Sequence, residues 1–228
     1  MDKKMLAADQ AAEMIKDGMV VGLGTGSTAY WAIHRLSQRI KEGLQIRAVP
    51  TSEHTKQMAM DLDIPLVTFA DIEHVDVTID GADEISPDFH LIKGGGGALY
   101  REKVVAQQSK IVMIVADDSK QVEQLGAFPL PVEIVPFGWE PTARQIQKLG
   151  CRTTLRKTDE RAFTTDNGNW ILDCDFGRID DPSALHRSLK MLTGVVETGL
   201  FLHAADLVFI GTNDGVIRKE RSDTMKIK

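Results

Sequence analysis

Short apolar runs and helical patterns alternate through the first half of the chain. Residues 2–17 are predicted to form a helix, because apolar side chains recur at helical spacing and Gly18 follows them. The apolar run at residues 19–23 predicts a buried strand, which opens into a glycine-rich turn before a second helical pattern. A strand, a glycine turn and a helix in this order form the first half of a βαβ unit.

The same alternation continues to about residue 129. The predicted elements are strands over residues 46–49, 75–80, 89–92 and 111–115 and helices over residues 55–62 and 98–109. The run at 111–115 is apolar throughout, which is typical of a parallel strand covered on both faces. These elements predict an α/β layered main domain with a parallel-type sheet.

The pattern changes after Pro129. The predicted elements are strands over residues 132–135, 152–156, 170–172 and 195–201 and helices over residues 140–149 and 183–192. The pair Asn167-Gly168 between two of these strands is the strongest short signal for a β-hairpin. A β-α-β-β-α-β order is that of the ferredoxin-like arrangement. The apolar residues 207–211 are then expected to return to the main sheet.

Composition and charge are ordinary for a globular protein, with 43% hydrophobic and 26% charged residues. The net charge of -6 argues against a nucleic-acid partner, which relies on basic surface. It leaves room for a small anionic substrate held by a few cations and amides. No run of about 20 apolar residues predicts a membrane span, and the first residues lack the apolar stretch of a secretory signal. A cytoplasmic protein without a membrane partner is expected.

Metal-ligand patterns are absent from the sequence. No two of the six histidines have the i, i+4 spacing of a helical ligand pair, and Cys151 and Cys174 have no metal-site spacing. Two cysteines also do not imply a disulfide framework. We therefore expect no metal, and the reaction inferred below leads us to expect no cofactor.

The first cluster that could carry chemistry is the glycine-rich turn of residues 22–28. Glycines let the backbone turn tightly, and the following helix presents N–H groups and a positive dipole end to an anion. Ser27 and Thr28 add hydroxyl donors or cap the helix. A phosphate site and a plain tight turn are the two interpretations. The turn also fits the degenerate dinucleotide fingerprint, but Pro50-Thr51-Ser52 stands where that fingerprint expects an acid, and no Walker lysine follows.

The second cluster, Asp80-Gly81-Ala82-Asp83-Glu84, directly follows a predicted strand. Open α/β sheets place their sites at the carboxyl ends of strands. Two carboxylates across a Gly-Ala turn suit acid–base work or a divalent metal. Aspartates that cap the amides of a turn are the structural alternative.

The third cluster is Lys93 followed by four consecutive glycines, residues 94–97, and then by a predicted helix that carries Glu102. Consecutive glycines are costly in chain entropy, so they are expected where the backbone approaches a ligand closely or where a loop flexes. A flexible linker is the alternative, but it would not normally lie between a strand and a helix of one sheet. Glu102 falls in the first turns of that helix, near the same strand ends.

The three clusters together resemble the ribose-5-phosphate isomerase A family. The motifs that carry the resemblance are Val21-Gly22-Leu23-Gly24-Thr25-Gly26-Ser27-Thr28, Asp80-Gly81-Ala82-Asp83-Glu84, and Lys93-Gly94-Gly95-Gly96 with Arg101-Glu102-Lys103. Further matches are residues 116–122, 128–133, 143–145, 165–169 and 194–201, so that the resemblance runs from about residue 19 to residue 217. It implies a Rossmann-like main domain, residues 1–129 and 204–228, with an inserted ferredoxin-like α+β domain, residues 130–203.

The resemblance also implies the residues of the site. The substrate-binding residues it implies are Thr25, Gly26, Ser27, Thr28, Asp80, Gly81, Ala82, Asp83, Lys93, Gly94, Gly95, Gly96 and Lys120. Glu102 is implied as the proton acceptor. Gly97 and Tyr100 depart from the family pattern, where Ala and Thr are expected. A homodimer acting on a sugar phosphate in the non-oxidative branch of the pentose phosphate pathway is the corresponding expectation.

The implied reaction interconverts D-ribose 5-phosphate and D-ribulose 5-phosphate through an enediol. It removes a C–H proton beside a carbonyl and returns it to the neighbouring carbon, so one base, Glu102, serves both steps. Lys93 suits the developing oxyanion, and Asp80 or Asp83 suits ring opening. No hydride moves, so no nicotinamide is needed.

Two other classes of protein share parts of this pattern. A phosphosugar-sensing regulator would need a DNA-binding module, and only 21 residues precede the glycine loop. A nicotinamide-dependent oxidoreductase would bind its cofactor in a titration.

Overall fold

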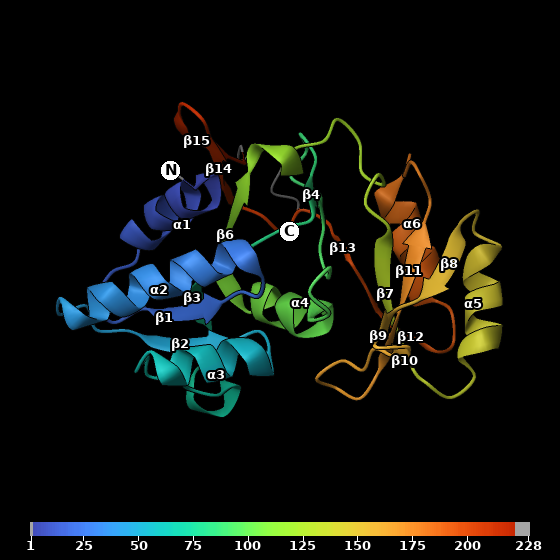
Figure 1. The fold of residues 1–228 in the computed structure, drawn as a ribbon, viewed down its shortest axis with the longest axis horizontal. Coiled ribbons are helices and arrows are strands. Elements are labelled where there is room, and N and C mark those ends of the chain that lie inside the picture. Colours follow the sequence, from blue (N-terminus) through green and yellow to red (C-terminus); the bar gives the residue numbers. More distant parts are fainter. Residues whose placement is uncertain (1, 222–228) are drawn as a thin grey trace. The chain divides into compact units, whose positions relative to one another are not determined.

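The structure of the protein, a computed structural model, describes residues 2–221 (Figure 1). The chain divides into two compact units. The first comprises Met1–Ala82, Arg101–Lys120 and His203–Lys228, and the second comprises Asp83–Tyr100 and Gln121–Leu202. Within the described residues, no helix combines the length and the apolar character that a membrane crossing requires.

A six-stranded sheet forms the centre of the first unit. Its strands, in spatial order, are β15 (Gly215–Glu220), β14 (Leu207–Thr212), β6 (Ser109–Asp117), β3 (Val75–Asp80), β1 (Val20–Leu23) and β2 (Arg47–Pro50). All neighbouring strands pair in parallel except β14 and β15, which form an antiparallel hairpin. The predicted α/β class with a parallel-type sheet is confirmed, and β14 returns to the main sheet as expected.

Four helices belong to this part of the chain: α1 (Lys3–Glu13), α2 (Ser27–Lys41), α3 (Glu53–Asp61) and α4 (Leu99–Gln107). The buried face of α1 consists of alanines at residues 7, 8, 11 and 12, and these small side chains let the helix approach the sheet closely. The predicted helix over 2–17 ends earlier, at Glu13, and Gly18 follows it in a positive-φ turn.

A four-stranded antiparallel sheet forms the main part of the second unit. Its strands, in spatial order, are β12 (Val195–Thr198), β7 (Leu130–Ile134), β11 (Trp170–Asp175) and β8 (Arg152–Leu155). The helices α5 (Trp139–Gln147) and α6 (Pro182–Lys190) complete the predicted β-α-β-β-α-β order along the chain. Alternate strand residues such as Val132 and Leu172 pack with Ile146 and Leu189 of these helices in one core. The other positions of β7 and β11 hold charged side chains such as Glu133 and Asp173, together with the apolar Pro131 and Ile171.

Smaller sheets complete the second unit. β13 (Leu200–Phe201), β5 (Leu91–Ile92) and β4 (Glu84–Ile85) form a three-stranded sheet, and β9 (Lys157–Thr158) pairs with β10 (Arg161–Ala162). The strand predicted over residues 195–201 is therefore two strands in different sheets, separated at Gly199. Short 3-10 turns at Phe69–Asp71 and Asp118–Lys120 belong to the first unit.

The two strands predicted to form a hairpin, β8 and β11, do pair antiparallel, but a tight two-residue turn forms in the segment between them. Asp159 and Glu160 connect β9 and β10, and both have the positive φ values, 48° and 64°, that a two-residue hairpin turn needs. The chain turns at Asn167-Gly168 as predicted, and β11, which follows this turn, pairs antiparallel with β8, its predicted partner. The pair β9–β10 is inserted between β8 and this turn, so Asn167-Gly168 is not a two-residue connection between the two strands.

The predicted domain bounds differ from these compact units. Residues 83–100 and 121–129 belong to the second unit, although the prediction assigned them to the main domain. The reason is the small sheet, in which β5 pairs with β4 on one side and with β13 on the other. Compactness alone does not define a domain, so the bounds 1–129, 130–203 and 204–228 stay a prediction.

Candidate active site

The glycine loop between β1 and α2 packs against the end of β3. A Cβ added to Gly24 would stand 2.6 Å from the Cα of Asp80, so only glycine fits there. The Gly24 N–H donates to the carbonyl of Ile79 at 2.9 Å. One carboxylate oxygen of Asp80 accepts from the N–H groups of Thr25, at 3.1 Å, and Gly81, at 2.8 Å. The structure thus brings three predicted site residues together, and the buried Asp80 anchors the loop.

Hydroxyl groups hold the other side of this loop. The Thr25 hydroxyl lies 2.8 Å from that of Thr51, 2.9 Å from that of Ser52 and 3.2 Å from that of Thr55. The Thr55 hydroxyl also donates to the carbonyl of Gly24 at 2.9 Å. Thr51 and Ser52 directly follow β2, where the dinucleotide fingerprint expects an acid, and Thr55 lies in the first turn of α3. Sequence reasoning noted that no acid stood there but did not assign these hydroxyls to the site.

The N-terminus of α2 is suited to an anion. Gly26 precedes the helix with a φ of 110°, no acidic residue lies in the first turn, and no side chain of the described residues caps it. Lys4, at the start of α1, donates from its Nζ to the Ser27 hydroxyl at 2.9 Å. Helix N-termini attract anions through their N–H groups and dipole. Sequence reasoning predicted Ser27 and Thr28 here but missed Lys4, because only the packing of α1 on α2 brings it to the loop.

A second lysine lies at the end of β6, the strand beside β3. Lys120 ends the 3-10 turn that follows this strand, and it is half-buried. Burial alone would raise the pKa of Asp117, but hydrogen bonds from Ser119 and the charges of Lys4 and Lys120 bring it below its usual value of 3.8. Both lysines therefore lie near one carboxylate at the carboxyl edge of the sheet, beside the glycine loop.

Glu102 lies in the first turn of α4 and is 4% exposed. A Cβ on Gly22 of β1 would stand 2.7 Å from the Cγ1 of Val105, so α4 packs directly on this strand. Glu102 precedes Val105 by three residues and shares its side of the helix. Because α4 leads straight into β6, it runs opposite to the strands, and its first turn lies toward their carboxyl ends. The same edge thus receives Glu102 and the glycine loop.

Arg101, beside Glu102, is tied to α3. Its guanidinium donates to the carboxylate of Glu53 at 2.8 Å. This hydrogen bond, followed by one from Lys56, lowers the pKa of Glu53 below its usual value of 4.5. The contact joins the first turns of α3 and α4 at the surface of the first unit.

In the second unit, Lys93 directly follows β5. It is 3% exposed, its N–H donates to the carbonyl of Gly199 at 2.9 Å, and its Nζ lies 5.4 Å from the ring centroid of Phe201. A Cβ on Gly199 would stand 2.9 Å from Pro131 and would overlap the Lys93 carbonyl. Gly199, just before β13, therefore holds the backbone of Lys93, and Gly199 is itself held by Pro131 of β7.

The glycines after Lys93 form a turn that packs against protein atoms. The Gly97 N–H donates to the carbonyl of Gly94 at 2.9 Å, and both residues have positive φ, 83° and 103°. A Cβ on Gly94 would stand 2.8 Å from the Cβ of Leu99, and one on Gly97 would stand 2.6 Å from the ring of Phe163. Close approach to the protein itself therefore already requires glycine at these positions, whether or not a ligand also lies near.

Asp83 holds the exposed part of this turn. Its carboxylate accepts from the Gly95 N–H at 2.8 Å, and its own N–H donates to the carbonyl of Ile92 at 2.8 Å. The structure thus brings Asp83 together with the Lys93–Gly96 segment. The neighbouring Glu84 has a different task, because its buried carboxylate accepts from the N–H groups of Gly126, at 2.7 Å, and Phe128, at 2.6 Å. It fastens the loop before β7.

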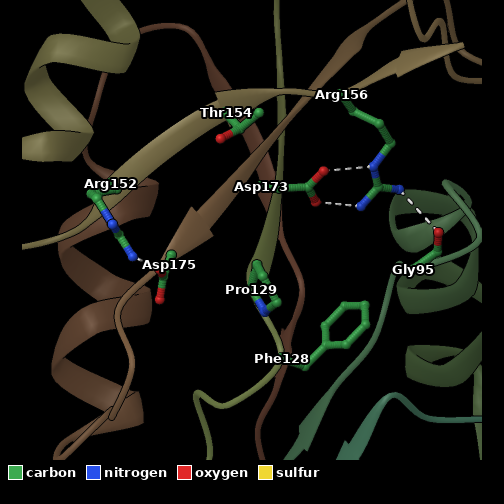
Figure 2. A pocket seen from close by; sticks show the side chains of 8 residues that line it. All are labelled: Gly95, Phe128, Pro129, Arg152, Thr154, Arg156, Asp173 and Asp175. Carbon is green, nitrogen blue, oxygen red and sulfur yellow. Dashed lines mark hydrogen bonds and ion pairs between the residues drawn. The ribbon is translucent and has the colours of Figure 1, made fainter.

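An open pocket of about 660 Å³ lies on the sheet face of the second unit that the helices leave uncovered (Figure 2). The residues that line it are Gly95, Phe128, Pro129, Arg152, Thr154, Arg156, Asp173 and Asp175. Two arginine–aspartate pairs, Arg152 with Asp175 and Arg156 with Asp173, neutralise each other's charge along it. Gly95 connects the pocket to the glycine turn.

No group of three or more His, Cys, Asp or Glu side chains suited to a metal ion occurs among residues 2–221.

The two cysteines are close enough to share a hydrogen bond. Donation from the Cys174 thiol lowers the pKa of Cys151 and, together with burial, raises that of Cys174 itself.

Comparison with known proteins agrees with this geometry. The sequence profile of ribose 5-phosphate isomerase A (phosphoriboisomerase A) matches residues 47–215. Ribose-5-phosphate isomerase A of Bacillus mycoides (strain KBAB4) is 55% identical over 217 residues, which are 95% of this chain and 98% of that protein.

Two solved structures are also similar over nearly the whole chain. Ribose 5-phosphate isomerase A of Methanocaldococcus jannaschii superposes with a TM-score of 0.92 at 40% identity, covering 96% of this chain and 98% of that one. A D-ribose-5-phosphate isomerase in complex with phospho-erythronic acid gives a TM-score of 0.93 at 37% identity, covering 97% and 100%. This chain belongs to the ribose-5-phosphate isomerase A family, whose members are isomerases.

Proposed function

We propose that this chain interconverts D-ribose 5-phosphate and D-ribulose 5-phosphate through an enediol, with Glu102 as the base. Membership of the isomerase family supports the reaction. The observation that carries the substrate class is the α2 N-terminus, where Lys4 reaches Ser27 and no acidic side chain lies in the first turn. This arrangement suits a phosphate group.

The phosphate is proposed to lie against the first turn of α2. N–H groups at this turn, the hydroxyls of Ser27 and Thr28, and the cations Lys4 and Lys120 are its partners. Holding the phosphate keeps the reacting carbons in register with the base, which lowers the entropic part of the barrier. Thr25 then acts mainly through the loop, since its hydroxyl lies among those of Thr51, Ser52 and Thr55.

Glu102 is proposed to take the proton from one carbon and return it to the other. Its burial in the first turn of α4 supports this role, because a base that acts on a C–H bond works best away from water. Lys93 is proposed to stabilise the oxyanion that develops on the neighbouring oxygen. The relative bound to phospho-erythronic acid supports this mechanism, since a carboxylate resembles the charged enediolate.

Ring opening is assigned to Asp80 or Asp83. Asp80 also anchors the glycine loop through Thr25 and Gly81, so its replacement is expected to weaken phosphate binding as well. Asp83 holds Gly95 and leaves the phosphate loop untouched. Comparing Asp80→Asn with Asp83→Asn, by KM and by the rate of ring opening, assigns the step.

The direct test is to add ribose 5-phosphate to the purified chain and to follow ribulose 5-phosphate as it forms. Conversion in both directions without added nicotinamide is the expected result. No conversion, together with saturable nicotinamide binding, would replace this proposal with the oxidoreductase alternative.

We also propose that the enzyme acts as a homodimer in the cytoplasm, in the non-oxidative branch of the pentose phosphate pathway. The proposal rests on family resemblance and on the charge of sugar phosphates, which keeps them in the compartment where they are made. Light scattering of the purified protein tests the oligomeric state, and cell fractionation tests the location.

A further inference from the structure

We propose that Arg156, held by Asp173, is a positioning residue for the isomerase reaction and acts by orienting the glycine turn of residues 94–97. The inference rests on the proposed function, because it assumes that this turn faces the reacting end of the substrate. Arg156 directly follows β8, outside the three motifs that the sequence analysis assigned to the site.

Arg156 uses both ends of its guanidinium. Its Nε and Nη2 donate to the two carboxylate oxygens of Asp173 at 3.0 Å and 2.5 Å, in a bidentate pair. Its Nη1 donates to the carbonyl of Gly94 at 2.8 Å. The same atom donates to the carbonyl of Gly95 at 3.2 Å (Figure 2). The Arg156 side chain is 15% exposed and that of Asp173 is 26% exposed. A planar, bidentate and largely buried guanidinium is a rigid anchor for these two carbonyls.

The anchor lies opposite a second one. Asp83 accepts the Gly95 N–H at 2.8 Å, so the Gly94–Gly95 peptide is held at both its oxygen and its nitrogen. Phe163 packs against Gly97, and its ring centroid lies 5.9 Å from the guanidinium carbon of Arg156. Backbone bonds from Phe163 to Arg156 and from Arg156 to Ile171 tie these residues to β11. The four-stranded sheet of the second unit therefore holds the glycine turn in place.

Peptide geometry gives this anchor a consequence for the site. In a trans peptide the C=O and the next N–H point in opposite directions, and the described residues contain no cis peptide. Because Arg156 holds the Gly95 carbonyl, the Gly96 N–H must point away from Arg156. We infer that this orientation presents the Gly96 N–H to the substrate. Four consecutive glycines would otherwise sample many orientations, so a fixed donor needs an outside anchor.

Arg156→Ala removes the anchor, and Arg152→Ala is its matched control. Arg152 begins β8, the strand that Arg156 follows, and it also pairs with an aspartate of β11, but through a single contact with Asp175 at 2.6 Å and with a side chain that is 89% exposed. Each variant is compared with the parent in kcat, KM and the inhibition constant of phospho-erythronic acid. Inhibition constants do not depend on the fraction of folded enzyme, so they separate positioning from a loss of stability.

For Arg156→Ala, we expect kcat/KM to fall about 10- to 100-fold. Inhibition by phospho-erythronic acid should weaken by more than the change in KM, because a donor aimed at developing charge acts mainly in the transition state. Arg156→Lys should recover part of the loss, since an ammonium group reaches one carbonyl but cannot also form the bidentate pair. Arg152→Ala should match the parent in every value.

Arg156→Ala within threefold of the parent in kcat/KM and inhibition would overturn the inference, as would an equal loss in Arg152→Ala. If Arg156→Ala fails to fold by circular dichroism, Asp173→Asn and Arg156→Lys decide by the same measurements. An inactive parent would instead overturn the proposed function, so the two failures are distinguishable.

Discussion

The backbone of Gly24 lies so close to that of Asp80 that a Cβ on Gly24 would stand 2.6 Å from the Asp80 Cα. The glycine is therefore required by the contact between the loop after β1 and the end of β3. The Asp80 carboxylate then bonds to the Thr25 N–H, which fixes the direction in which the loop enters α2. The packing of two strand ends thereby sets the position of the proposed phosphate site.

Gly24→Ala should force the loop away from β3. We expect a loss of about 1–3 kcal/mol in the free energy of unfolding, as for other overpacked sites, and a raised KM for ribose 5-phosphate. Denaturant unfolding and steady-state kinetics measure the two effects. Gly18→Ala is the control, because Gly18 has a φ of 81° but no atom within 4 Å of an added Cβ. It should lose stability while keeping the parental KM. An unchanged KM in Gly24→Ala would separate the loop from phosphate binding.

The main sheet could be predicted from sequence because its signals are local. Residues 111–115 are apolar throughout, and the strand, glycine turn and helix of residues 19–41 follow each other directly. For the second unit, the sequence predicted the order of the helices and strands along the chain. Its split between β12 and β13 could not be read from sequence, since the break at Gly199 depends on the distant Lys93 and Pro131.

Only those site residues that lie in continuous sequence motifs could be predicted. Lys4 and Thr51 come to the glycine loop through packing of α1 on α2 and of β2 beside β1, and no local pattern marks them. Arg156 is 62 residues from Gly94 in the chain. For the glycines of residues 94–97, the sequence predicted that the backbone approaches a ligand closely or that the loop flexes. The structure shows that Leu99 and Phe163 already require glycine at positions 94 and 97.

Asp76 should make stability depend on pH in the acid range. The Val20 N–H, at 2.9 Å, lowers its pKa below the usual 3.8, and Lys110 and His74 lower it further against the effect of burial. A lowered folded-state pKa contributes stability above about pH 4, and the contribution is lost as the pH falls through the folded-state value. Asp76→Asn should therefore cost about 1.5 kcal/mol at neutral pH and progressively less below about pH 4.

Urea unfolding of the parent and Asp76→Asn at several pH values checks this sign. A difference between the two proteins that stays constant from neutral to strongly acid pH would contradict it. The comparison of two proteins at each pH removes the titration of all other groups that they share.

Isomerisation should survive exhaustive chelation. The described residues contain no group of three metal-binding side chains, and Lys93 can supply the positive charge that a metal would otherwise provide. Activity is measured after dialysis against EDTA and again after a divalent ion is added. Loss on chelation with recovery on addition would show that the roles of Lys93 and the aspartates are wrongly assigned.

Lys93→Met should lower kcat/KM strongly while leaving the fold intact. The methionine has a similar length and an apolar stem, but it lacks the ammonium group near Phe201 and cannot stabilise an oxyanion. Removing such a donor typically raises the barrier by roughly 3–4 kcal/mol. Lys148→Met, at an exposed position after α5, is the control and should behave as the parent. Activity of Lys93→Met within threefold of the parent would make Lys93 structural.

Glu102→Gln tests the proposed base. The amide has nearly the shape of the carboxylate and still accepts a hydrogen bond, but it cannot take a proton from carbon. We expect kcat to fall by at least about 100-fold, within the usual range of general-base contributions. The melting temperature and the inhibition constant of phospho-erythronic acid should change little. Glu140→Gln is the control, since Glu140 also lies in the first turn of a helix, α5, but is exposed.

Proton exchange distinguishes loss of the base from loss of a later step. In heavy water the parent should exchange the substrate C–H proton with solvent, because the proton passes through the Glu102 carboxylate between the two carbons. Glu102→Gln should lose this exchange in parallel with turnover. If the variant exchanges that proton at nearly the parental rate, then another group removes it, and Asp80 or Asp83 becomes the base. If exchange and turnover both stop while the inhibitor still binds, the group that moves the proton is the one buried in the first turn of α4.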